Sequence, residues 1–316
     1  PRLIQWLPLL MAGGFTIKVL SLTTPELLAQ FVSGGKRAAY DNDITHFGIY
    51  SAISLFAAIS SIWTVRGVYA PLLRRVLYAV VAVCAVVAVA GLVFSQTRAA
   101  WLATAVVIVL CIGLGLRGVR AGTVPRKPMF IAGVSAGLVV VCVALLFRDL
   151  LTNRLLDQAG TVAHLLQGGW SNPPLDPVGF RISAYREGLL TWIEAPWFGH
   201  GPGIDWFTFR NRTEPALDYL MHFHNAYINL LATWGVVGFT LFAIVFALLV
   251  VRTWRAHSEG NLPIHVGMFL LVSTISLFLF GLFDQILLDE RMPFLLGILG
   301  GVATARGSRG MLRRAG

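Results

Sequence analysis

The feature that most constrains this sequence is a series of long apolar runs, each about as long as a lipid bilayer is thick. One helical crossing of a bilayer core needs about 20 mainly apolar residues. Eight segments meet that requirement: residues 1–20, 44–63, 76–95, 100–117, 129–147, 225–251, 264–284 and 292–305. With 56% hydrophobic and only 13% charged residues, the chain lacks the polar surface of a soluble globule of this size. The sequence therefore predicts an all-α protein, a polytopic bundle of about eight transmembrane helices.

Basic residues divide unequally between the two sides that these spans define. The side that holds the C-terminus carries fourteen Lys and Arg and one acid, whereas the opposite side carries eleven basic and fourteen acidic residues. Because cytoplasmic loops collect positive charge, we expect both ends of the chain in the cytoplasm and residues 148–224 outside it. The formal net charge of +10 follows from this orientation and from contact with anionic membrane lipids, and it gives no reason to expect nucleic acid as a partner.

The predicted orientation divides the chain into three parts. Transmembrane helices with short loops occupy 1–147, one long outer loop occupies 148–224, and transmembrane helices with a basic cytoplasmic tail occupy 225–316. The chain opens on Pro-Arg, without an initiator Met or a recognisable cleavable signal, so we expect further N-terminal spans to precede it. Its three cysteines all fall in apolar spans, where a thiol behaves as a small apolar group, and they form no disulfide or metal pattern.

The segment from Arg148 to Tyr227 interrupts this apolar pattern and is the main candidate for an active site. It holds six arginines, eight acids, four tryptophans and four histidines, two of them beside the next apolar run. Residues 167–179 are rich in Gly, Pro, Asn and Asp, which indicates irregular backbone. Residues 180–194 predict a short amphipathic helix lying in the membrane interface. On that helix Arg181 and Tyr185 share one face, while Arg186 lies about 140° further round, so the two arginines need not act together.

Two arginines outside this segment are also expected near the non-cytoplasmic surface of the membrane. Arg37 follows Lys36 and precedes two aspartates, so it either forms ion pairs within a solvated loop or contacts a phosphate. Arg98 lies between two apolar spans, in a turn too short to leave the headgroup region. An arginine at that depth is costly and needs a partner. It either extends to a lipid phosphate or binds a substrate phosphate, with the hydroxyls of Ser95 and Thr97 beside it.

Three features of the loop and its margins each have more than one interpretation. The alternate glycines of 199–203 form either a tight turn or a set of N–H groups that bind an anion. His224, at the start of a span, is either an anchor at the membrane interface or a general base, since neighbouring arginines favour the neutral imidazole that a base needs. Asp284, at the end of another span, either orients the histidine or forms an ion pair with an arginine.

Three sequence elements together resemble the bacterial O-antigen ligase and polymerase superfamily. Residues 95–103, Ser-Gln-Thr-Arg-Ala-Ala-Trp-Leu-Ala, resemble its Ser/Thr-x-Ser-Arg-x-x-x-Leu-Ala element. Residues 181–203 resemble its second element, an arginine and an aromatic residue in a short helix, followed by Pro and a Gly-x-Gly turn. Residues 224–228, His-Asn-Ala-Tyr-Ile, with the Gly-x-x-Gly of 235–238, resemble its third. Thr97 and Tyr185 depart mildly from the usual serine and tryptophan, and the family has ten to twelve spans where about eight are visible here.

The resemblance implies an inverting, metal-independent glycosyltransferase that uses a lipid-linked donor at the periplasmic face of the bacterial inner membrane. An O-antigen ligase moves O-antigen polysaccharide from undecaprenyl diphosphate to a sugar hydroxyl of the lipid A core during lipopolysaccharide biosynthesis. The long outer loop, which would then be periplasmic, is more similar to that of a ligase. An O-antigen polymerase or a protein O-oligosaccharyltransferase of the same superfamily is the alternative.

The chemistry of such a transfer suits the residues of the outer segments. A departing diphosphate requires fixed positive charge, which arginine provides, and the attacking hydroxyl requires a base. We therefore predict that Arg98 and Arg181 bind the diphosphate, with secondary contacts from Arg37 and Arg186. His224 is the predicted base, and Asn225, Tyr185 and Asp284 are predicted to support it. No metal or other cofactor is predicted, because neither a metal motif nor a pair of carboxylates for a covalent route is recognisable.

Two other classes of function share some of these features. A transporter or flippase of an anionic glycolipid would bind its substrate with the same outer arginines, but the spans carry few charges near mid-membrane and no internal repeat indicates two related halves. A membrane scaffold would dock a partner through the tryptophans of the loop. Turnover of a lipid-linked saccharide separates the enzyme from both.

Overall fold

The computed structural model describes residues 3–34, 36–39, 44–122, 145–174, 176–212, 222–260 and 262–288, with a few isolated positions beyond them. Every regular element in this described part is a helix. Six helices there are long and apolar enough to cross a membrane. They are α1 (Leu7–Leu22, extended by the short helix Leu3–Trp6), α3 (Ile44–Arg66), α4 (Pro71–Phe94), α5 (Arg98–Arg120), α11 (Ala226–Ser258) and α12 (Ile264–Gly281). The predicted all-α polytopic bundle is confirmed, whereas the spans expected at 129–147 and 292–305 lie almost entirely outside the described residues.

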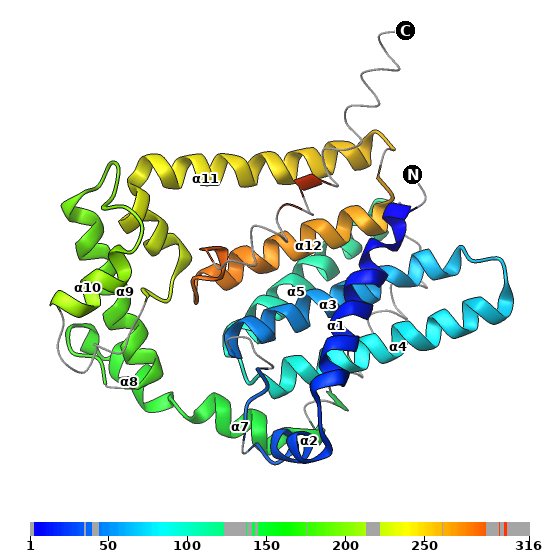
Figure 1. Ribbon diagram of the computed structural model, residues 1–316, viewed down its shortest axis with the longest axis horizontal. Helices are drawn as coiled ribbons and strands as arrows, with labels where there is room; N and C mark the ends of the chain where they lie inside the picture. The colour runs from blue at the N-terminus through cyan, green and yellow to red at the C-terminus, as the bar shows by residue number, and fades with distance from the viewer. Residues whose placement is uncertain are drawn as a thin grey trace, which may run out of the picture.

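Helix α3 forms the centre of the bundle, with α1, α4, α5 and α12 packed around it (Figure 1). Its buried positions are mostly small, including several alanines and serines, which lets neighbouring backbones approach closely. A Cβ atom added at Gly91 of α4 would lie 2.6 Å from the hydroxyl of Ser51 on α3. A Cβ at Gly48 of α3 would lie 2.9 Å from the hydroxyl of Ser95. These two glycines therefore allow α3 to pack tightly against the C-terminal end of α4.

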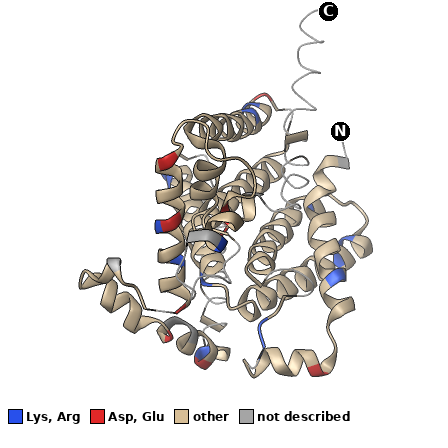
Figure 2. Cartoon of the chain, turned by 60° about the vertical axis from the view of Figure 1, so that its left-hand side comes forward, with Lys and Arg blue, Asp and Glu red and all other residues tan. Residues whose placement is uncertain are grey.

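Charged side chains lie mainly at helix ends and on the shorter helices, while the long helices are largely uncharged (Figure 2). Large apolar side chains are exposed along the outer faces of α4, α5 and α11. An outward apolar surface of this kind suits contact with lipid, because lipid tails are as apolar as these side chains and their exposure to lipid costs little. The distribution agrees with the membrane-spanning assignment.

Four short helices lie at one end of the bundle, between α5 and α11 in sequence (Figure 1). They are α7 (Arg148–Leu156), α8 (Ala159–Leu166), α9 (Pro177–Glu194) and α10 (Ile204–Arg212), with a short 3₁₀ turn at Gly169–Ser171. Helix α2 (Pro25–Val32), which follows α1, lies at the same end beside α7. The predicted helix at 180–194 begins three residues earlier, at Pro177, because the carboxylate of Asp176 caps the first turn and proline suits that position.

Helix α11 has a sharp kink at Gly235, where φ is 64° and ψ is −169°. The turn after α9 fills this kink. The N–H groups of His200 and Gly201 donate to the carbonyls of Ala232 and Thr233, at 3.0 and 2.8 Å. The N–H of Val236 in turn donates to the carbonyl of Pro196 at 2.9 Å. The kink therefore joins α9 to α11, and so fixes the helix that carries Arg181 relative to the start of α11.

Replacing Gly235 by alanine is expected to lower the free energy of unfolding by at least about 2 kcal/mol. This combination of φ and ψ is essentially restricted to glycine and costs another residue about 1–3 kcal/mol, and the added Cβ would overlap the backbone of Trp197 and Phe198. Thermal unfolding of the purified protein in detergent measures the change.

The matched control is Gly113→Ala, in the interior of α5, where an added Cβ meets nothing within 4 Å. Its Tm is expected to equal that of the unmodified protein or exceed it slightly, because alanine is a better helix former than glycine. Equal Tm values for the two variants would show that the kink does not require glycine.

Candidate functional site

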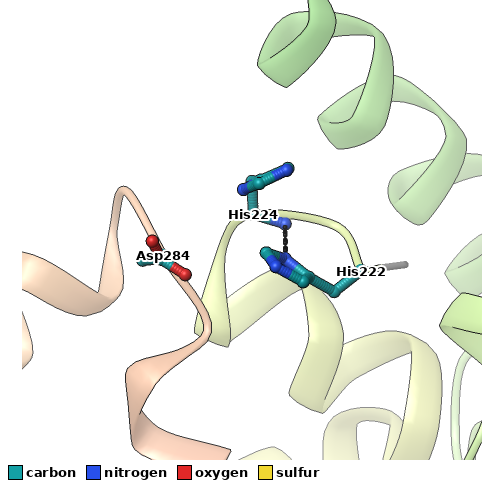
Figure 3. Close-up of side chains that lie close together, drawn as sticks. All are labelled: His222, His224 and Asp284. Carbon is teal, nitrogen blue, oxygen red and sulfur yellow. Dashed lines mark hydrogen bonds between the residues drawn. The ribbon is translucent and has the colours of Figure 1, made fainter. Parts of the chain in front are cut away.

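The four residues before α11 form a turn that fixes the position of His224. The N–H of His224 donates to Nδ1 of His222 at 3.1 Å, and the two imidazole rings lie 4.0 Å apart between centroids (Figure 3). His224 has a φ of 53°, in the left-handed region that a non-glycine residue adopts at a cost of about 1 kcal/mol. Backbone strain of this kind persists only where surrounding contacts hold it, and it is concentrated at functional sites.

Asn225 supplies several of the contacts that hold this turn. Its side-chain oxygen accepts hydrogen bonds from the N–H groups of Tyr227 and Ile228, at 2.9 and 3.1 Å, and so caps the start of α11. Its side-chain nitrogen donates to the carbonyl of Leu282 at 2.9 Å. The Tyr185 hydroxyl donates to the same carbonyl at 3.1 Å. One carbonyl at the end of α12 therefore joins residues of α9 and α11.

Asp284 lies directly beside the two histidines. It is 3% exposed, and one potential ligand atom from each of His222, His224 and Asp284 lies within 4.8 Å of the others (Figure 3). The carbonyl of Asp284 accepts a hydrogen bond from the N–H of Ala226 at 3.2 Å, which ties the carboxylate to the histidine turn. Two imidazoles and a carboxylate are ligands that zinc accepts. The negative charge of the carboxylate would also stabilise the imidazolium that forms when either histidine gains a proton.

Tyr185, on α9, lies within electrostatic reach of both Asp284 and Arg181. Burial, the largest cause, raises the pKa of the Tyr185 hydroxyl above its ordinary value, and the charge of Asp284 acts in the same direction. The guanidinium of Arg181 and the hydrogen bond with Asn225 oppose this rise. The charges of Arg181 and Asp284 therefore both act on one tyrosine. Arg186 is exposed, one residue beyond Tyr185 on a different face of the helix.

Arg98, the first residue of α5, lies near the N-terminus of α9. Its guanidinium donates to the side-chain oxygen of Gln158. Burial by itself would raise the pKa of Asp176, but hydrogen bonds from Gly179, Thr161 and Val178, together with the charge of Arg98, hold it below its ordinary value. Since Asp176 caps the N-terminus of α9, Arg98 lies near the start of the helix that carries Arg181.

Arg37 is bound to the turn that precedes Arg98. Its Nε donates to the carbonyl of Ser95 at 3.0 Å, and its Nη2 donates to the carbonyl of Gln96 and the hydroxyl of Thr97, at 3.3 and 3.4 Å. These bonds hold Arg37 and Arg98 on one short turn. The acids that were expected as alternative partners of Arg37, at 41 and 43, lie outside the described residues.

Residues 83–243 match the family model described as O-antigen ligase. The chain belongs to the O-antigen ligase family. The match covers half of the sequence and includes Arg98, Arg181 and His224. A search of curated proteins found no match to this chain. The protein is therefore a multi-pass membrane member of a family of glycosyltransferase-like ligases and polymerases.

The glycine run at 199–203 had two interpretations, a tight turn or a set of N–H groups that bind an anion, and the structure favours the tight turn. All three glycines have positive φ, but the N–H groups of residues 199 to 201 already donate to Ala195 and to the carbonyls at the α11 kink. A Cβ at Gly199 would overlap the backbone of Thr233 and Trp234. The run therefore allows two backbones to pack together, and those three N–H groups are occupied within the protein.

Four residues of the site are absent from the sequence-based prediction: His222, Gln158, Thr161 and Asp176. A signal for Asp176 was present, because Asp followed by Pro is typical of a helix start. His222 was visible as part of a histidine pair, but its contact with the backbone of His224 depends on the turn. No local pattern indicates Gln158, whose partner Arg98 is 60 positions away.

Proposed function

We propose that this protein is an O-antigen ligase, an inverting, metal-independent glycosyltransferase. It would move O-antigen polysaccharide from undecaprenyl diphosphate to a sugar hydroxyl of the lipid A core, at the periplasmic face of the bacterial inner membrane. Residues 148–224 would then be the periplasmic loop. The observation that carries this proposal is the meeting of His224, Asp284 and the α9 residues Arg181 and Tyr185 at one end of the bundle.

The arginines supply the charge that a departing diphosphate needs. Guanidinium groups stay protonated and bind phosphate oxygens through paired N–H donors. Arg98 would bind the diphosphate from beside the N-terminus of α9, and Arg181 would bind it from the helix itself. Arg37 would add positive charge from the turn that precedes Arg98. The side chain of Gln158 that now accepts from Arg98 is neutral, so a diphosphate would replace it as the stronger acceptor. Arg186, which is exposed, would make a weaker, secondary contact.

His224 would remove the proton from the attacking hydroxyl. The hydroxyl oxygen forms a bond to the anomeric carbon while the bond from that carbon to the diphosphate oxygen breaks, and the proton passes to the imidazole. The electron pair leaves with the diphosphate, and because the hydroxyl attacks from the opposite face of the sugar, the anomeric configuration inverts in one step. The nearby carboxylate of Asp284 would stabilise the imidazolium that forms, while Asn225 and Tyr185 hold the backbone around it.

A transfer assay with purified components tests this function. The full chain is reconstituted in metal-free vesicles with an undecaprenyl-diphosphate-linked saccharide as donor and lipid A core as acceptor. Saccharide attached to lipid A is the expected product, since the proposed base and the proposed diphosphate-binding arginines would act without a metal.

Three other outcomes would contradict the ligase proposal. Longer saccharide chains on the donor lipid, with lipid A unmodified, would identify a polymerase. Saccharide on a Ser or Thr side chain of an added acceptor protein would identify an O-oligosaccharyltransferase. Movement of the donor across the bilayer without any transfer would identify a flippase.

A further inference from the structure

A second candidate binding site lies beside Arg98, in a cavity of about 670 Å³ between α2, α7 and the turn that joins α4 to α5. Polar side chains on its lining come from Ser33, Gln96, Arg148, Asp149, Asn153 and Asp157. The volume lies within the range of ordinary ligand sites. We propose that this cavity binds the saccharide portion of a substrate, as a site separate from the groups that act on the diphosphate. This inference rests on the proposed glycosyltransferase function.

The turn between α4 and α5 contributes Gln96 to the lining of the cavity. Gln96 is 8% exposed and has a φ of 50°, a left-handed conformation that is rare for a residue other than glycine. Its backbone N–H donates to the carbonyl of Val93 at 3.0 Å, and its carbonyl accepts from Arg37 at 3.3 Å. A strained but well-bonded residue that presents a buried amide to a cavity is the kind of feature that functional sites retain.

One wall of the cavity is a polar row along α7. Asp149, Asn153 and Asp157 follow one another at intervals of four residues, so their side chains lie on one side of the helix. Carboxylate and amide groups accept and donate the hydrogen bonds that sugar hydroxyls offer. Leu145, Phe147 and Leu150 add apolar surface to the lining, which suits the C–H faces of a sugar ring.

The charge of the lining argues for a neutral, hydroxyl-rich ligand. Two carboxylates and one guanidinium line the cavity, so an anionic ligand such as a phosphate would meet net negative charge there. The arginines that suit a diphosphate are not part of this lining: Arg37 donates to the carbonyl of Ser95, and Arg98 donates to Gln158. The two neighbouring sites therefore differ in the chemistry that they accept.

The position of the cavity connects it to the proposed reaction. Gln96 precedes Arg98 by two residues, and Asp157 precedes Gln158, the hydrogen-bond partner of Arg98. A saccharide whose diphosphate is bound at Arg98 would extend into the cavity, and so would an acceptor oligosaccharide approaching the same point. Both sources present the same hydroxyl-rich surface, so the experiment must distinguish them.

The test compares Asn153→Ala with the unmodified protein and with Thr152→Ala. Asn153 lines the cavity, whereas Thr152 is an exposed neighbour on the same helix that does not. In the vesicle transfer assay, Asn153→Ala is expected to raise KM for one substrate about tenfold while kcat changes less than twofold. A raised KM for the lipid A core identifies the acceptor as the occupant, and a raised KM for the lipid-linked donor identifies the donor saccharide.

A second measurement needs no turnover. Saturation-transfer NMR of the full chain in lipid nanodiscs, with the delipidated core oligosaccharide or the released donor saccharide as probe, is expected to show binding that Asn153→Ala weakens and Thr152→Ala preserves. Binding of this pattern without any transfer activity would support the cavity while rejecting the proposed function. Equal KM values and equal saturation transfer for the two variants would overturn the cavity proposal.

Discussion

Substitution of His224 by alanine is expected to reduce saccharide transfer by about 100- to 10,000-fold, the usual contribution of a general base. The residue lies in a turn whose backbone is held by His222 and whose neighbour Asn225 is bonded to α11 and α12. Asp284 lies near enough to stabilise the imidazolium. Alanine removes the proton acceptor and leaves these backbone contacts in place. Initial rates of transfer to lipid A core, at saturating donor and acceptor, measure the loss.

His164→Ala is the matched control for this prediction. His164 is an exposed histidine on α8, bonded to the carbonyl of Asn172 at 3.2 Å and outside the proposed site. Its loss is expected to change the rate less than twofold. Both variants should elute as folded protein and unfold at similar temperatures. A His224→Ala variant that is folded and retains most of its activity would refute the assignment of the base.

Replacing Arg181 by alanine is expected to lower kcat/KM for the lipid-linked donor by about 100-fold. A charged hydrogen-bonding group is worth about 1.5–3 kcal/mol in its ground state, and charge that develops on the leaving diphosphate adds to this in the transition state. Arg181→Lys should recover only part of the activity, because an ammonium group lacks the paired donors of a guanidinium. Inhibition by undecaprenyl diphosphate, measured with each variant, separates binding from the chemical step.

Arg186→Ala provides the comparison on the same helix. Arg186 is exposed, whereas Arg181 is half-buried and acts electrostatically on Tyr185. We therefore expect a loss of less than about tenfold from Arg186→Ala. Equal losses from the two variants would mean that the diphosphate is bound by general positive charge along α9 and that Arg181 has no specific role in binding it.

The fold was largely predictable because the length of each apolar segment and the placement of the basic residues can be read directly from the sequence. Six of the expected spans are helices of membrane-crossing length, and their ends follow local signals such as Pro71 at the first turn of α4 and Asn225 at the cap of α11. The kink of α11 was not predicted. Gly235 reads as an ordinary helical glycine in the sequence, and only the turn at 196–201 packed against it explains its positive φ.

Sequence pattern alone determined that this chain is a helical membrane protein of the O-antigen ligase family, and it predicted which residues would carry its chemistry. Arg98, Arg181 and His224 could be selected because each lies in one of the three sequence elements that resemble the family. Only the tertiary structure decided how they are grouped. It placed Asp284 beside two histidines some 60 positions away, Arg98 against Gln158, and Arg37 on the turn before Arg98. These contacts arise where separate helices end at one side of the bundle, and no local pattern specifies which helix ends will meet.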